Sequence, residues 1–104
     1  MSAVIELDDQ SFTREVKLSE KPVVLVDFYA TWCGPCQMQH PILEEVAKEQ
    51  TYVKVCRIDV DKAPRMAARY GVTSVPTIMV FRQGQIVNIA LGLQTKENLT
   101  NMVL

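Results

Sequence analysis

Apolar and polar residues alternate along the chain in short blocks that predict strands joined by helices. Residues 23–29 are apolar on both alternating faces except at Asp27, which is the pattern of a strand buried in the middle of a helix-covered sheet. Gln83 and Gly84 lie between two apolar runs and predict the turn of an antiparallel hairpin. The predicted strands are residues 4–7, 23–29, 52–60, 77–81 and 86–91.

The longest predicted helix runs from about residue 34 to residue 49. Pro41 lies inside it and is expected to kink it, because a mid-helix proline removes one hydrogen bond and crowds the preceding turn. The core-facing stripe of this helix, at three- and four-residue spacing, is expected to be Met38, Ile42, Leu43, Val46 and Ala47.

Three shorter helices complete the pattern. They are a helix from about residue 10 to 18 capped by Asp8 or Asp9, a short helix capped by Asp61, with Pro64 in its first turn and Gly71 as its stop, and a last helix that begins at Thr95. Their inward residues are expected to include Phe12, Val16, Leu99, Met102 and Val103. The order βαβαβαββα predicts one α/β domain over residues 1–104, with a mixed sheet and helices on both faces.

Composition and charge argue against several classes of protein, among them nucleic-acid-binding and membrane-spanning proteins. Hydrophobic residues make up 48% of the chain and charged residues 22%, as in an ordinary globular protein, and a net charge of -1 gives no general attraction to nucleic acid or an anionic membrane. The longest apolar run, residues 22–26, is far shorter than the roughly 20 residues of a membrane-spanning helix. Residues 1–9 lack the pattern of a signal or transit peptide, so we expect a cytoplasmic protein.

Two of the three cysteines, Cys33 and Cys36, have Cys-x-x-Cys spacing, which in a reducing compartment indicates redox chemistry or a metal. Structural zinc needs four ligands, and the other candidates are only Cys56 in a predicted strand and His40 one turn after Cys36. We therefore expect no metal. Cys56 is interpreted as a small buried apolar residue rather than a regulatory thiol.

The position of the two cysteines predicts different roles for their sulfur atoms. Cys33 is expected at the N-terminus of a helix, where free N–H groups and the helix dipole stabilise a thiolate and make it the nucleophile. Cys36 lies one turn deeper and is suited to resolve a mixed disulfide. Gly34 and Pro35 hold the sulfur atoms close without a bulky side chain over them.

Several separated motifs make the chain resemble the thioredoxin family over nearly its whole length. They are Trp32-Cys33-Gly34-Pro35-Cys36, Asp27 on the preceding strand, Pro41, Val75-Pro76-Thr77, Gly84 and Gly92. The resemblance implies the thioredoxin fold, with a five-stranded mixed sheet, four helices and a cis peptide bond before Pro76 that faces the dithiol. It also implies a monomeric oxidoreductase without a cofactor, whose partners are disulfide-containing proteins and a thioredoxin reductase, with no nucleic acid or membrane.

The resemblance further implies where substrate binds. Trp32, Val75, Pro76 and Gly92 match positions that line a shallow apolar groove, and a cis peptide bond leaves the backbone of Val75 free to pair with an extended substrate segment. Simple packing is the alternative role for Trp32, Val75 and Gly92.

Asp27 is a carboxylate on an otherwise apolar strand, so burial is expected to raise its pKa. The resemblance implies that Asp27 is the general base that accepts the Cys36 proton through water. The alternative is a structural ion pair between Asp27 and Arg57.

Five positions depart from the family's usual pattern. Arg57 replaces a lysine near the buried aspartate and keeps its charge, so it is expected to tune the site, and Gln37 removes a positive charge after the second cysteine. Tyr29 replaces a tryptophan, and Leu93 replaces a small residue and is expected to reshape the groove. Histidine ordinarily titrates in the physiological range, so His40 is either a tuning residue for the dithiol or a partly exposed side chain without a role.

The sequence leaves three functions to compare. The leading one is protein-disulfide reduction, in which the dithiol is oxidised and then restored by a reductase. The second is a binding or scaffold subunit that uses the groove around Trp32, Val75 and Pro76 without turnover. The third, disulfide oxidation or isomerisation, is disfavoured by the Gly-Pro dipeptide, which reducing members of the family share.

Overall fold

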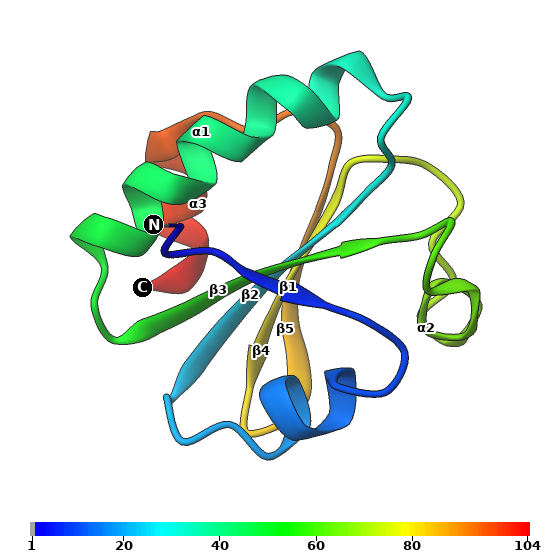
Figure 1. The fold of residues 1–104 in the computed structure, drawn as a ribbon. Helices are drawn as coiled ribbons and strands as arrows, with labels where there is room; N and C mark the ends of the chain where they lie inside the picture. Colours follow the sequence, from blue (N-terminus) through cyan, green and yellow to red (C-terminus); the bar gives the residue numbers. More distant parts are fainter. Residues whose placement is uncertain (1) are drawn as a thin grey trace.

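The computed structural model describes residues 2–104 and contains one mixed sheet with helices on both faces (Figure 1). The elements are β1 (Ile5–Leu7), η1 (Thr13–Lys17), β2 (Val23–Tyr29), α1 (Gly34–Glu49), β3 (Val53–Asp59), α2 (Pro64–Arg69), β4 (Thr77–Arg82), β5 (Gln85–Leu91) and α3 (Lys96–Val103). The strand order is β1-β3-β2-β4-β5, with β3 parallel to β1 and β2, and β4 antiparallel to β2 and β5. The predicted fold and the central place of residues 23–29 are therefore confirmed.

The helices form two layers, one on each face of the sheet. α1 and α3 lie together on one face, and η1 and α2 lie on the other (Figure 1). Each layer encloses its own apolar core: Leu25 packs with Leu43 under α1, whereas Phe28 packs with Phe12 on the opposite face. Because β2 contributes to both cores, all of its residues are buried, which explains why its sequence is apolar on both faces.

The predicted hairpin turn between β4 and β5 is confirmed. Gln83 and Gly84 have φ angles of 52° and 76°, and positive φ at both central residues is the geometry that matches the twist of the flanking strands. A register shift between Val80 and Phe81 marks an irregularity in the β4-β5 ladder.

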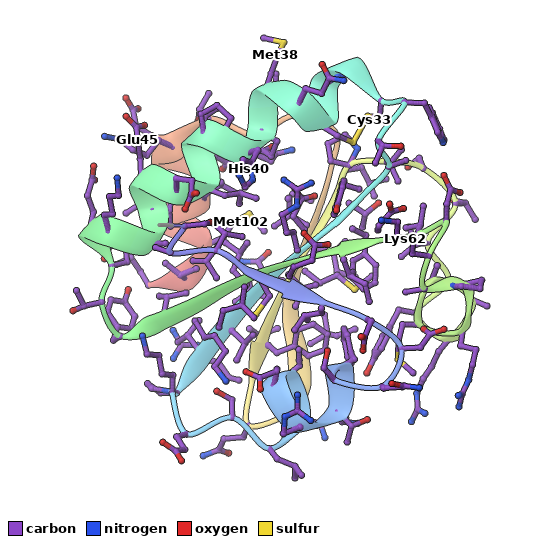
Figure 2. All side chains as sticks on the ribbon, viewed as in Figure 1. Cys33, Met38, His40, Glu45, Lys62 and Met102 are labelled. Atoms are coloured by element: carbon purple, nitrogen blue, oxygen red, sulfur yellow. A yellow bond between two sulfur atoms is a disulfide. The ribbon has the colours of Figure 1, made fainter. Side chains whose placement is uncertain are left out.

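The buried stripe of α1 differs from the prediction. Met38 is 62% exposed and points away from the protein (Figure 2), whereas Gln39 is fully buried. Gln39 Nε2 donates to Gln94 O at 3.1 Å and Gln94 N donates to Gln39 Oε1 at 2.8 Å, so this amide satisfies its polar atoms inside the protein. Pro41 lies inside α1, and the kink stays a prediction. The buried residues of α1 are Cys36, Gln39, Leu43 and Val46, and Ile42 and Ala47 are partly buried.

The first predicted helix is shorter than expected. It is a π-helix confined to η1 and has no side-chain cap. Asp8 instead accepts hydrogen bonds from Gln10 N at 2.9 Å and Ser11 N at 2.8 Å, so it stabilises the turn that precedes the helix. Phe12 and Val16 are buried as predicted.

The predicted cap of α2 by Asp61 is wrong. The N–H groups of Arg65 and Met66 donate to the Asp9 carboxylate at 3.4 and 3.0 Å, so a residue far away in the sequence satisfies the start of this helix. Thr95 lies at the start of α3, as predicted, and caps the helix, because its side chain accepts a hydrogen bond from Asn98 N.

Candidate active site

The two cysteines of the Cys-x-x-Cys motif lie at the start of α1, just beyond the end of β2. Cys33 is the N-cap residue and Cys36 lies in the first turn, with their Cα atoms 5.2 Å apart and their sulfur atoms joined in a disulfide. Figure 2 shows Cys33 at this end of the helix. Cys36 N donates a hydrogen bond to Cys33 Sγ at 3.2 Å. The predicted position of Cys33 at a helix N-terminus is therefore confirmed.

Val75 and Pro76 face the dithiol. The peptide bond between them is cis, as the family resemblance implies, and Val75 O lies 3.7 Å from Cys33 Sγ. Pro76 O accepts a hydrogen bond from Gly92 N at 2.8 Å, and Gly92 has a φ of 83°, a conformation that glycine adopts without steric cost. The structure therefore places Val75 against Cys33 and joins the loop of Pro76 to the loop of Gly92, as the expected substrate groove requires.

Trp32 presents an apolar surface beside the dithiol. Its side chain is 72% exposed, and its Nε1–H donates to Asp61 Oδ2 at 2.9 Å, which fixes the orientation of the ring. Core packing therefore does not explain this residue. A shallow cleft of about 140 Å³ adjoins the ring and is lined by Trp32, Val60, Val72, Thr73, Ser74 and Val75.

Asp27 is buried on β2, with 2% of its surface exposed. Burial raises its pKa from 3.8 to about 7, while the charge of Arg57 lowers the pKa and that of Glu6 raises it. Among residues 2–104, the Oδ1 atom of Asp27 finds no hydrogen-bond partner. The raised pKa agrees with the sequence-based expectation, and it enables this carboxylate to accept a proton near neutral pH.

Arg57 does not form the ion pair with Asp27 that the sequence leaves as an alternative. The two residues are register partners on β3 and β2, yet Arg57 Nε lies 3.1 Å from Glu6 Oε1, and no ion pair with Asp27 exists within the described chain. The guanidinium carbon lies 3.6 Å from the centre of the Tyr29 ring, and Nη1 lies 2.6 Å from His40 Nδ1. Asp27 is therefore left without a direct cationic partner.

A second cleft, of about 320 Å³, gives access to Cys36 from the side of Arg57. It is lined by Tyr29, Ala30, Thr31, Cys36, Gln37, His40 and Arg57. Glu6 lies beside Arg57, which lines this cleft. The sequence does not identify Glu6 as a site residue, because its place beside Arg57 depends on the register of β1 against β3. His40 is partly exposed, as one of its two predicted alternatives has it, and it contacts Arg57.

Cys56 is a free and fully buried thiol. Burial raises its pKa to about 12, so it stays protonated and unreactive, as expected of a small apolar residue. Within residues 2–104, no three or more His, Cys, Asp or Glu side chains gather in a way that could hold a metal ion. The helices of the same residues include none long and apolar enough to cross a membrane.

Known proteins share this sequence and this geometry. The thioredoxin family model matches residues 3–104. Thioredoxin 1 of Nostoc sp. is 42% identical, covering 96% of this chain and 94% of its own, and the thioredoxin of Rickettsia conorii is 46% identical, covering 91% and 90%. The solved structure of a mutant thioredoxin from Halobacterium salinarum has a TM-score of 0.88 and 41% identity, covering 99% of this chain and 91% of that one. With this match along its length, the chain belongs to the thioredoxin family and is a protein-disulfide oxidoreductase that reduces its substrates by thiol–disulfide exchange.

Proposed function

We propose that Cys33 makes the nucleophilic attack and that Cys36 completes the reaction. In the reduced protein, the Cys33 thiolate attacks one sulfur of a substrate disulfide, forms a mixed disulfide and releases the other substrate sulfur as a thiolate. Cys36 then loses its proton and attacks Cys33 Sγ. The disulfide between the two cysteines forms, the second substrate thiolate leaves, and two electrons have passed to the substrate.

The position of Cys33 as the N-cap of α1 is the observation that carries this assignment. In the oxidised structure, Cys36 N–H already donates to Cys33 Sγ at 3.2 Å, and the same N–H and the helix dipole would stabilise a Cys33 thiolate. Gly34 and Pro35 occupy the first turn, and neither places a large side chain over the sulfur atoms.

Asp27 is the proposed base for Cys36. Its pKa of about 7 suits proton transfer near neutral pH, and water in the cleft that Cys36 lines would carry the proton. Arg57 tunes this step through its charge, since it is the cation that lowers the pKa of Asp27.

Substrate binding is assigned to the surface formed by Trp32, Val75, Pro76 and Gly92. The exposed indole and the half-buried Val75 supply apolar contact, and the backbone around the cis peptide bond supplies hydrogen bonds to an extended segment. A scaffold role without turnover is not favoured, because the curated relatives are thioredoxins.

The proposed setting is a reducing compartment, the cytoplasm, in which a thioredoxin reductase restores the dithiol. Free, buried Cys56 fits such a compartment, where structural disulfides are rare. We assign residues 1–104 to a single domain that works as a monomer on disulfide-containing proteins, without a bound cofactor, nucleic acid or membrane.

Alkylation of the reduced protein over a pH series tests the assignment of the nucleophile. We expect iodoacetamide to modify Cys33 first, with an apparent pKa below the ordinary thiol value of about 8.5, because free N–H groups and the helix dipole at a helix N-terminus stabilise a thiolate. Cys36 is expected to react more slowly, and buried Cys56 only after unfolding. Mass spectrometry of the peptides assigns each site, with Cys33→Ser as the control that loses the fast phase. A fast phase that maps to Cys36 would contradict the assignment.

A further inference from the structure

Three charged residues form a row across the sheet beneath α1. Glu6, Arg57 and Asp27 occupy paired positions on β1, β3 and β2. Paired residues of parallel strands project from the same face, so Arg57 lies between two carboxylates. Its ion pair is with Glu6, at 3.1 Å. The pKa of Asp27 therefore depends on whether the Arg57 guanidinium contacts Glu6 or Asp27.

Two contacts besides Glu6 hold the guanidinium in place. Tyr29 lies against it, with 3.6 Å from the guanidinium carbon to the ring centre, and the Tyr29 hydroxyl donates to Glu6 Oε2 at 2.8 Å. His40, on the side of α1 that faces the sheet (Figure 2), lies 2.6 Å from Arg57 Nη1 through its Nδ1. Arg57 is thus held by residues from three different elements.

The contact with Arg57 assigns a role to each nitrogen of the imidazole. A guanidinium has only donors, so Nδ1 of His40 is the acceptor in this hydrogen bond. The ring proton of the neutral form then lies on Nε2, which is 3.7 Å from Glu44 Oε2. A side chain without an acceptor at this position would leave Arg57 without this hydrogen bond.

We propose that His40 is a positioning residue that holds Arg57 beside Glu6 and keeps it away from Asp27. Loss of this contact allows Arg57 to move toward Asp27, which then becomes a weaker base. The consequence for the reaction rests on the proposed role of Asp27 as the base for Cys36. The charged and titratable groups around His40 and Arg57 are Glu6 on β1, Asp27 and Tyr29 on β2, and Cys36 and Glu44 on α1.

Two substitutions of His40 separate the hydrogen bond from the rest of the side chain. His40→Asn places an amide oxygen near the position of Nδ1, so it keeps an acceptor for Arg57. His40→Leu removes the acceptor and keeps similar bulk. Both variants leave the cysteines and Asp27 unchanged.

The test is an NMR titration of the Asp27 carboxyl carbon in the oxidised protein, in which neither disulfide cysteine titrates. In His40→Leu we expect the midpoint of Asp27 to fall by about 1 pH unit or more, because an opposite charge within reach lowers the pKa of a carboxylate by that amount. In His40→Asn we expect the wild-type midpoint. Circular dichroism checks the fold, and His40→Ala gives the same comparison if the leucine variant does not fold.

A wild-type midpoint in folded His40→Leu or His40→Ala would overturn the proposal, and so would an equal fall in His40→Asn. The titration involves no turnover, so its outcome does not depend on Asp27 being the base. An Asp27→Asn variant that resolves the mixed disulfide at the wild-type rate would remove the base assignment and leave the contact between His40 and Arg57 standing.

Discussion

Cys33→Ala is expected to lower the rate of protein-disulfide reduction by at least ~1,000-fold, because no other thiolate can begin the exchange. Cys36 is 4% exposed in the first turn of α1, and Cys56 is fully buried with a raised pKa, so neither replaces the nucleophile. Reduction of insulin with dithiothreitol as electron donor, followed by turbidity, measures the loss.

Cys56→Ala is the matched control for this substitution. It removes a thiol of the same size from the core and is expected to keep the wild-type rate, because Cys56 lies outside the set of residues that contact the disulfide. A Cys33→Ala protein that still reduces insulin at the wild-type rate would contradict the assigned nucleophile.

Asp27→Asn is expected to stabilise the folded protein at pH 8 by up to ~4 kcal/mol. The pKa of Asp27 is about 7 in the folded state against an ordinary value of 3.8, and each unit of difference corresponds to ~1.4 kcal/mol. The folded state binds the Asp27 proton more tightly, so protonation of Asp27 stabilises the wild-type protein. This contribution to the wild type is complete below pH 3.8, declines as the pH rises and is absent above about pH 7. Asparagine has no charge to bury and removes this pH dependence.

Urea unfolding of the oxidised protein at pH 4 to 8 measures this effect. The wild-type free energy of unfolding is expected to fall, relative to Asp27→Asn, across the interval from about 4 to 7. Glu45→Gln changes an exposed carboxylate on α1 and is the control that should show no such difference. Equal pH dependence in wild type and Asp27→Asn would show that Asp27 is not buried in charged form above neutral pH.

The same substitution is expected to slow the reaction at its second step. Without a carboxylate to accept the Cys36 proton, resolution of the mixed disulfide should slow by roughly 10- to 100-fold, at or below the lower end of the usual range for a general base. Quenched-flow trapping followed by mass spectrometry would show the mixed disulfide accumulating. Unchanged resolution above pH 7 would contradict the base assignment.

Elements with a strong local pattern can be predicted closely from this sequence. β2 and α1 begin and end at the predicted residues, because β2 is buried on both faces and α1 starts at a cysteine followed by Gly34 and Pro35. The same pattern places Cys33 at a helix N-terminus. The position of the two cysteines therefore depends on one short segment and can be predicted from its sequence.

Contacts between segments that are far apart in the sequence cannot be predicted in the same way. Spacing along α1 favours apolar Met38 as a core residue, yet polar Gln39 is buried because Gln94 from another segment satisfies its amide. The ion pair of Arg57 with Glu6 rather than with Asp27 likewise depends on the register of the strands and on the packing of α1 over them. The periodicity of apolar residues along the chain specifies neither the burial of Gln39 nor the ion pair of Arg57.

Trapping the intermediate in Cys36→Ser tests the order of the two cysteines most directly. The reduced variant is incubated with a disulfide-containing protein, and peptide mass spectrometry locates the cross-link. We predict a stable mixed disulfide on Cys33, because the variant lacks the thiol that releases the substrate. A protein that releases fully reduced substrate at the wild-type rate, or a cross-link that maps to Cys56, would contradict the account.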